Sequence, residues 1–366
     1  MKKSMLISAL ALAALATTSC SNEETKAIEP QSNAIEFGTY LGRDAISRGT
    51  VLDLGGLKLS GFGVFAAYTA QNDFSTETMN FMSNEEVTYD TDAWTYSPLK
   101  YWPNNPGDKV SFFAYAPYNV TGATAGTTSA TVNFTVQDAV ASQKDLVVAE
   151  ALKNKTKQAI TGKVNFTFKH VLARIGLNVE AQVDLVNDDN TGDPDDSTLG
   201  NGSLASETTI KVTKVELIGK FDKDGVIDLT NSSWSGVAPA ATDVTYTWST
   251  ENSNFVTSVA NKVTTTKQQL NDVDHYAMII PQDMTTSKVK IRVTYTVTTE
   301  DAKLDGGKSE ITNTITSDEF AFNFEQGKAY MFNLHLGMTS VKFDAEVSGW
   351  ENATNETVVN VPINAN

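Results

Sequence analysis

The amino-acid sequence predicts an all-β protein with two Greek-key β-sandwich domains in tandem. Apolar residues recur at every second position in segments rich in Val, Ile, Thr, Phe and Tyr, which is the pattern of half-buried strands. Clusters of Gly, Pro, Asn and Asp separate these segments, and no helical spacing of apolar residues extends beyond about ten residues. The chain is also longer than one typical sandwich.

The expected strands follow one another along most of the chain. The first, AIEFGTYL, places Ile35, Phe37 and Leu41 on one face. The same alternation recurs in KVNFTFKH, RIGLNVEAQV, TIKVTKVELIG, KVKIRVTYTVT and KAYMFNLHL. Short helical turns are expected at 171–174 and near 268–271. Many short strands with connections of Greek-key length favour β-sandwiches.

We expect the two sandwiches to meet at residues 162–163. The segment QKDLVVAEALKNKTKQAI is typical of a buried strand followed by a charged connector, and a new alternating pattern begins at Val164. This predicts an N-terminal sandwich over 34–162, a C-terminal sandwich over 163–350 and a tail over 351–366. Residues 20–33 are polar without periodicity, as in a flexible tether.

The N-terminus has the layout of a secretory signal. Two lysines precede an apolar run and the small residues Thr17, Thr18 and Ser19, and the only cysteine, Cys20, follows. A cysteine at this place accepts the lipid of a bacterial lipoprotein, so residues 1–19 would be the signal peptide and Cys20 the first mature residue. Thr17 departs from the leucine usual at its position. The alternative is a secreted protein with a chance cysteine.

Composition excludes several classes of function. The formal net charge is −16, which disfavours nucleic acid and anionic headgroups as partners. Once Cys20 is acylated, no thiol remains for disulfides, metal or catalysis. The histidines His170, His275 and His335 are far apart, and the common catalytic and phosphate-binding motifs do not occur. We therefore expect neither an enzyme nor a cofactor.

A cluster of aromatic residues admits two interpretations. It lies around a Pro/Gly-rich turn, where the alternating placement fits a hairpin that fills a sandwich core. Exposed rings in the same segment would instead form a platform for sugars. The cluster consists of Tyr96, Tyr101, Trp102, Phe112, Phe113, Tyr115 and Tyr118.

Four segments in order resemble the fimbrillin family of Bacteroidota, in particular its minor-fimbrillin-like branch. They are GFGVFAAY (61–68), SPLKYWPNNPGDKVSFFAYAPY (97–118), DLVVA (145–149) and VNFTFKHVLARIGLNV (164–179), and Val347–Trp350 fits as well. The resemblance spans residues 34–350. It implies two transthyretin-like β-sandwiches and a lipoprotein carried to the cell surface. It also implies assembly into fimbriae by donor-strand exchange, after an arginine-specific surface protease cuts the chain.

The residues of this chain allow that mechanism. Arg48, with Arg43 as the second choice, lies in an exposed linker after the strand that carries Ile35, Phe37 and Leu41. A cut there removes the lipid and this strand, and opens a sheet edge. The tail TVVNVPI offers a replacement strand with Val359, Val361 and Ile363 on one face. The alternative is that the tail completes its own C-terminal sandwich.

The long acidic loop over 187–206 carries two further candidates. Oxygen ligands suitable for calcium occur at Asp188, Asn190, Asp193, Asp195 and Asp196, but their spacing is not that of an EF-hand, and a solvated loop is the alternative. Ser197 lies in Asp-Ser-Thr, which matches the short sequence that Bacteroidota O-glycosylate.

Together these features predict a cell-surface precursor of a fimbrial (pilus) subunit that serves adhesion. Its lipid would anchor it in the outer membrane, where the polar start Ser21–Glu24 resembles the sorting signal for surface exposure. After processing it would join other fimbrial subunits in the fimbrium. The alternative is a monomeric surface lipoprotein of the same fold that binds glycans or host proteins.

Overall fold

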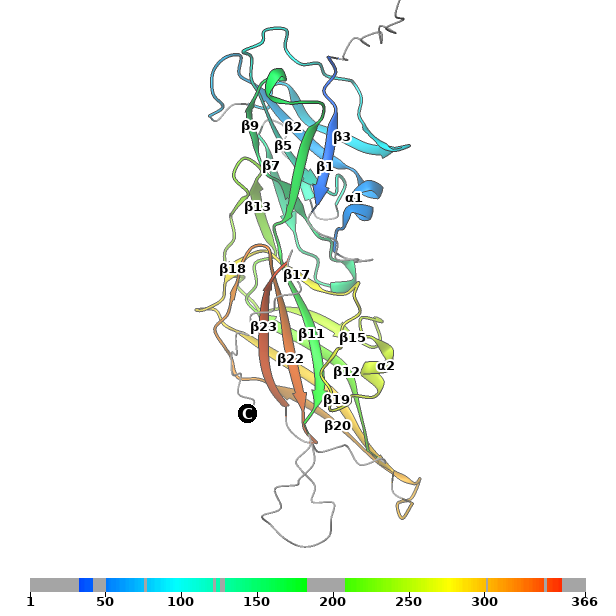
Figure 1. Cartoon of the computed structure of the whole chain (residues 1–366). Helices are drawn as coiled ribbons and strands as arrows, with labels where there is room; N and C mark the ends of the chain where they lie inside the picture. The colour runs from blue at the N-terminus through cyan, green and yellow to red at the C-terminus, as the bar shows by residue number, and fades with distance from the viewer. Residues whose placement is uncertain are drawn as a thin grey trace, which may run out of the picture.

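The chain forms an elongated molecule made almost entirely of β-strands (Figure 1). The computed structural model describes residues 33–41, 51–75, 78–120, 123–125, 129–182, 208–300, 302–338 and 341–350. Two β-rich parts lie end to end, and the prediction of an all-β fold is confirmed. Among these residues, no helix is long and apolar enough to span a lipid bilayer.

The upper part in Figure 1 contains the largest sheet. Its strand order is β1 (Phe37–Leu41), β10 (Val164–His170), β8 (Val147–Ala149), β5 (Val110–Ala116), β2 (Phe62–Tyr68), β3 (Met82–Asp90) and β4 (Ala93–Thr95), and β9 (Leu152–Lys155) also pairs with β5. The β1–β10 pair is parallel, and the other pairs are antiparallel.

A four-stranded sheet accompanies the largest one. Its order is β14 (Ser233–Ser235), β13 (Asp224–Asp228), β7 (Thr131–Thr135) and β6 (Ala123–Ala125). The short helices η1 (Val140–Ser142) and η2 (Lys157–Ala159) connect nearby strands. Because β13 and β14 come late in the chain, this sheet joins strands of both predicted domains.

The lower part contains two larger sheets and one short strand pair. One sheet has the order β16 (Gln268–Gln269), β11 (Ala173–Ala181), β22 (Lys328–Leu336) and β23 (Val341–Gly349), and β17 (Ala277–Ile279) also pairs with β11. The other has the order β15 (Val244–Ser249), β12 (Thr208–Gly219), β19 (Val289–Glu300) and β20 (Lys308–Thr316). The short pair is β18 (Gln282–Asp283) with β21 (Asn323–Phe324), and helix α2 (Thr257–Asn261) lies beside β12.

The helical segments differ from those expected. The predicted turn at 171–174 contains the start of β11, and the one near 268–271 contains β16. Helix α1 (Leu54–Ser60) was not predicted, because its first turn contains Gly55 and Gly56, which have poor helix propensity. Its N-cap Asp53 compensates by accepting a hydrogen bond of 2.6 Å from the backbone nitrogen of Gly56.

The change of sheet also differs from the expected boundary at 162–163. Strand β10 follows that point, yet it pairs with β1 and β8 in the largest sheet. The chain leaves this sheet only after His170. Side chains explain the difference, because Val164, Phe166 and Phe168 complete the hydrophobic core of the upper part.

Two hydrophobic clusters hold the molecule together. One, which we call the shared core, runs through both parts and includes the inward faces of the smaller upper sheet and of both lower sheets. The other, which we call the N-terminal core, lies on the opposite face of the largest sheet. It includes Ile35, Phe37, Leu41, Leu57, Phe62, Val64, Trp102, Phe112, Val164, Phe166 and Phe168. Strands β2, β5 and β8 contribute to both clusters, which explains their continuous apolar sequences.

Candidate functional site

The candidate site is the groove that β1 occupies between β10 and the segment over 94–102, which we call the seat of β1. This strand is the one predicted to be displaced. Ile35, Phe37 and Leu41 point into the N-terminal core and are 0%, 1% and 7% exposed. The ring of Phe37 lies 5.6 Å from that of Phe166 in a stacked arrangement and 6.1 Å from that of Phe62 in an edge-to-face arrangement. The strand therefore contributes apolar side chains that the rest of the core packs around.

One edge of β1 pairs with β10. The two strands are parallel, and Phe37 lies opposite Val164 while Leu41 lies opposite Phe168. Gly38 lies close to Asn165, because a Cβ atom at this position would lie 2.1 Å from the side-chain oxygen of Asn165. On this side β1 is the last strand of the largest sheet, so its removal frees the backbone groups of β10.

The other edge of β1 contacts the segment that follows β4. The backbone nitrogen of Ile35 donates to the carbonyl of Lys100 at 2.9 Å, and that of Trp102 donates to the carbonyl of Asn33 at 2.9 Å. The largest sheet thus curls until the chain after its far strand β4 returns to β1 and encloses the N-terminal core. Sequence reasoning missed this second edge, although the alternating run AWTY before Pro98 was a signal for it.

Two further side chains, one in β4 and one directly after it, also hold β1. The hydroxyl of Tyr96 donates to the carbonyl of Ile35 at 2.9 Å, and the indole Nε1 of Trp94 donates to Oγ1 of Thr39 at 3.1 Å. Burial raises the pKa of Tyr96, so this hydroxyl keeps its proton and remains a donor. The seat therefore contains fixed hydrogen-bond donors as well as an apolar floor.

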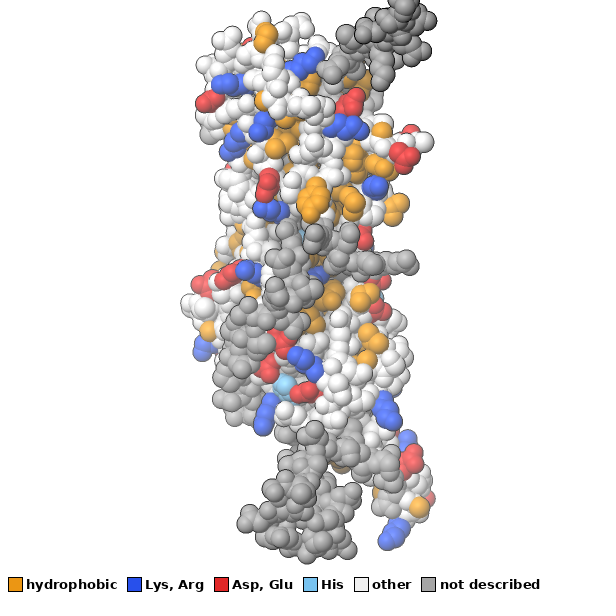
Figure 2. Space-filling view, in the orientation of Figure 1, with side chains coloured by type: hydrophobic (Ala, Val, Ile, Leu, Met, Phe, Trp, Pro, Cys, Tyr) orange, Lys and Arg blue, Asp and Glu red, His pale blue; other side chains and the backbone are white. Residues whose placement is uncertain are grey.

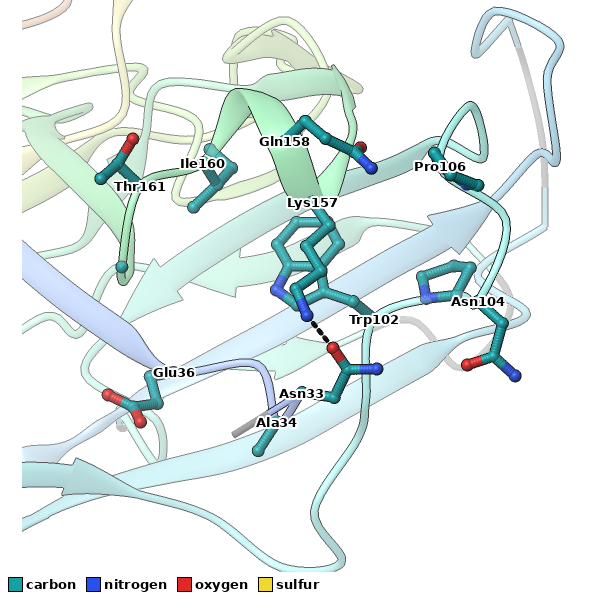
Figure 3. Close-up of a pocket in the computed structure, with 12 residues that line it drawn as sticks. Asn33, Ala34, Glu36, Trp102, Asn104, Pro106, Lys157, Gln158, Ile160 and Thr161 are labelled. Carbon is teal, nitrogen blue, oxygen red and sulfur yellow. Dashed lines mark hydrogen bonds between the residues drawn. The ribbon is translucent and has the colours of Figure 1, made fainter. Parts of the chain in front are cut away.

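A pocket of about 720 Å³ lies at the start of β1, at the outer pole of the upper part. In Figure 3 the Lys157 side chain passes in front of the Trp102 ring and reaches Asn33, whose side-chain oxygen accepts its hydrogen bond. Ile160 and Pro106 supply apolar wall, and the remaining lining groups are mostly polar. The pocket continues the seat of β1 beyond Ile35.

At the opposite end of the seat, three segments meet. The buried carboxylate of Asp145 accepts a hydrogen bond of 3.0 Å from the backbone nitrogen of Leu52 and lies 2.7 Å from Nδ1 of His170. The His170 ring stacks on Trp350, and the Arg174 guanidinium lies 5.2 Å from the Trp350 ring centre. The chain after the predicted cut, the end of β10 and the origin of the tail are thus adjacent.

The structure separates the members of the predicted aromatic cluster. Trp102, Phe112, Phe113 and Tyr115 are buried, Tyr96 and Tyr118 are half-buried, and Tyr101 is exposed. Most of the cluster therefore packs in the cores. Apolar side chains also show at the surface of the upper part in Figure 2, and the exposed ones in the upper part include Tyr40, Leu59 and Tyr101.

The three histidines occupy separate places. His170 and His335 lie in strands, and the two ring nitrogens of His335 are each 2.7 Å from a carboxylate oxygen, of Glu180 and of Asp344. The backbone carbonyl of His275 accepts a hydrogen bond from Trp248. Within the described ranges, no group of three or more His, Cys, Asp or Glu side chains is arranged to hold a metal ion.

Several predicted sites lie outside the described residues. They are Cys20, Arg43, Arg48, Ser197, the candidate calcium ligands at 188–196, and the tail residues Val359, Val361 and Ile363. The described chain stops at Leu41 before the two arginines and resumes at Val51, and it ends at Trp350 before the tail.

Comparison with known proteins identifies the family. The model of the fimbrillin-like family matches residues 58–350. The Fimbrium subunit Fim1C of Phocaeicola vulgatus is 27% identical over 398 aligned residues, which cover 93% of this chain and 95% of that protein. The crystal structure of a fimbrial protein from Bacteroides vulgatus is similar in fold, with a TM-score of 0.64 and 23% identity over 87% of this chain and 99% of that one. This chain therefore belongs to the fimbrillin-like family.

Proposed function

We propose that this protein is the precursor of a fimbrial subunit that polymerises by donor-strand exchange and serves adhesion at the cell surface. The observation that carries the proposal is the position of β1. This strand supplies buried side chains to the N-terminal core, yet it is the first strand of the described chain and the last strand of its sheet. It is the one strand of this sheet that a single cut detaches from the rest.

Proteolysis is the proposed trigger. An arginine-specific surface protease cuts after Arg48, or after Arg43, and separates β1 from the helix α1 that follows. The same cut releases the chain from the lipid on Cys20, so an outer-membrane precursor becomes a subunit free to join the fimbrium. Leu52 is held by Asp145 just beyond the cut, which favours a fixed new N-terminus rather than a loosened fold.

Loss of β1 leaves a groove that must be refilled. Burying a side chain such as Ile, Phe or Leu contributes about 1.5–3 kcal/mol to stability. Loss of Ile35, Phe37 and Leu41 exposes the core surface that they covered, and this strongly favours binding of a substitute strand. The proposed substitute is the tail of another subunit, identical or different, which inserts Val359, Val361 and Ile363. Each subunit then closes the groove of the next, and the two β-rich parts act as transthyretin-like building blocks.

The rival function, a monomeric glycan-binding lipoprotein, has less support. Four rings of the aromatic cluster are buried, and Tyr101 is its one exposed member. O-glycosylation at Ser197 and calcium binding by the acidic loop stay predictions that neither function requires.

A gel experiment separates the two functions. Surface fractions from cells that express the protein are analysed with and without heating, and compared with the variant Arg43→Ala/Arg48→Ala. A fimbrial subunit gives a ladder of heat-sensitive oligomers that is absent from the variant. A full-length monomer in both samples contradicts the proposal.

A further inference from the structure

We propose that the strand that replaces β1 enters antiparallel to β10, with Thr357 in the place of Thr39. This inference rests on the proposed function and adds the direction and register of the incoming strand. We argue this inference from the groups that line both edges of the seat of β1.

Along β1 and the residues that precede it, the inward-facing places are polar at Asn33 and Thr39 and apolar at Ile35, Phe37 and Leu41. From the pole inward, the places that face the core are those of Asn33, Ile35, Phe37, Thr39 and Leu41. Trp94 aims its Nε1 at the place of Thr39, 3.1 Å from the hydroxyl oxygen. Its ring is held by edge-to-face packing on Phe62 at 4.8 Å and on Tyr89 at 5.0 Å, so this donor does not follow a displaced strand. A replacement strand therefore needs an acceptor at the place of Thr39, whereas Lys157, the donor to Asn33, has a flexible side chain that can reach water instead.

The tail contains one set of residues that matches the three central places, those of Ile35, Phe37 and Thr39. On the face of Val359, Val361 and Ile363, the next residue toward the N-terminus is Thr357. In the antiparallel direction Thr357 takes the place of Thr39, Val359 that of Phe37, and Val361 that of Ile35. Ile363 then takes the place of Asn33, beside Trp102 and Ile160, where Lys157 no longer has the Asn33 oxygen as its acceptor. Asn355 takes the place of Leu41, at the end of the strand. Val359 is smaller than Phe37, so the surrounding aromatic rings must fill part of the volume that the Phe37 ring occupied.

In the parallel direction, Thr357 as the acceptor at the place of Thr39 cannot be combined with an apolar residue at the place of Phe37. With Thr357 in the place of Thr39, the polar Asn355 enters the aromatic space of Phe37. With the three apolar residues in the places of Ile35, Phe37 and Thr39, Trp94 loses its acceptor. In that register Pro362 also lies opposite Asn165, in the middle of the ladder with β10, where a strand must donate a hydrogen bond.

The antiparallel register places Pro362 outside the ladder with β10. It occupies the place of Ala34, which forms a bridge with Tyr101 on the other edge, whereas the pairing of β1 with β10 begins at Phe37. Val358 takes the place of Gly38, where its Cβ requires the Asn165 amide to turn aside. Every register puts a side chain at this place, so Gly38 does not decide between the directions.

Cysteine crosslinking in polymerised protein tests the direction. Thr167 lies opposite Tyr40, and the antiparallel register puts Glu356 at the place of Tyr40. The processed chain has lost Cys20, so a double variant carries only the two introduced thiols. We expect Glu356→Cys with Thr167→Cys to form a covalent ladder on mild oxidation. The matched pairs Asn364→Cys or Val358→Cys with Thr167→Cys should not.

The outcomes distinguish this inference from the proposed function. A ladder from the Asn364 or Val358 pair, or polymers that give no link in the Glu356 pair, overturns the inference and leaves strand exchange intact. A link within single chains shows that the tail fills its own groove and overturns both. If the unsubstituted, processed protein forms no polymers, the proposed function fails first.

A mutant cycle tests the contact itself. Purified precursor is cut with an arginine-specific protease, and the initial rate of polymerisation is measured. Thr357→Val should slow it about three- to tenfold, the value of one hydrogen bond, and Thr354→Val should not. In a Trp94→Phe background, whose folding is checked by precursor melting, Thr357→Val should have no further effect. An undiminished effect there overturns the assignment.

Discussion

The imidazole of His170 stacks on the indole of Trp350, with ring centres 4.2 Å apart and planes inclined by 6°. His170 is the last residue of β10, and Trp350 follows β23 at the end of the described chain. Asp145 fixes the His170 ring through its contact with Nδ1. The tail therefore begins beside the Phe168 end of the β1 seat, and its origin is held by both parts of the molecule.

Replacing Phe37 with Ala should destabilise the uncut precursor by about 3–5 kcal/mol, because it empties the centre of the N-terminal core. The matched substitution Tyr40→Ala, at a neighbouring position of β1 that is 55% exposed, should cost far less. Denaturant unfolding of the two variants measures both values. Equal losses would mean that β1 does not pack as the structure places it.

Cys20 should carry lipid and be the first residue of the mature lipoprotein. Cells labelled with a palmitate analogue should show label in the wild type and none in Cys20→Ala, because the chain has no other cysteine. Two or more acyl chains are needed for stable membrane anchoring, so the variant should also leave the membrane fraction. Equal labelling of both proteins would refute the assignment.

Maturation should cut after Arg48. N-terminal sequencing of polymerised protein should then read Gly49-Thr50-Val51, and Arg48→Ala should shift the start to Asp44 by cleavage after Arg43. Substitution of both arginines should leave the precursor uncut and unable to polymerise. A polymer whose subunits still begin at Cys20 would exclude this step.

Val361→Asp should abolish polymerisation and leave the precursor folded. In the proposed strand exchange, Val361 enters an apolar groove, where an unpaired carboxylate is costly. The control Val358→Asp places the same charge on the opposite face of the strand and should polymerise. Precursor melting and fibre formation are measured on one preparation, and an unfolded Val361→Asp precursor would indicate that the tail belongs to its own fold.

Acid should lower the stability of the lower part by protonating Glu216. Hydrogen bonds from Arg292, at 2.7 and 2.9 Å, lower the pKa of Glu216 below its ordinary value. The unfolded chain thus binds a proton at a higher pH than the folded one. The contribution to stability is present above the ordinary carboxyl pKa and is lost as the pH falls through the lowered one. Glu216→Gln should flatten this acid limb in melting curves, and an unchanged slope would assign it to other carboxylates.

Much of the fold follows from local sequence pattern. Period-two alternation identified β1, β10, β11, β12, β19 and β22, because a strand with one buried face repeats its apolar residues at every second position. The pattern failed where tertiary contacts override it. At 171–174 consecutive apolar residues resemble a helical turn, but Val171 and Leu172 are buried in the shared core and Ala173 begins β11.

By itself, the sequence determined that the protein is all-β, which side of β1 is apolar and which family it resembles. The tertiary structure decided what each strand packs against. It placed β10 with the upper sheet, paired β13 with β7 across the expected boundary, and returned the segment of Trp94 and Tyr96 to the free edge of β1. The physical reason is that side-chain alternation depends only on the local backbone, whereas the partners of a strand are set by which distant edges and apolar faces complete a closed core.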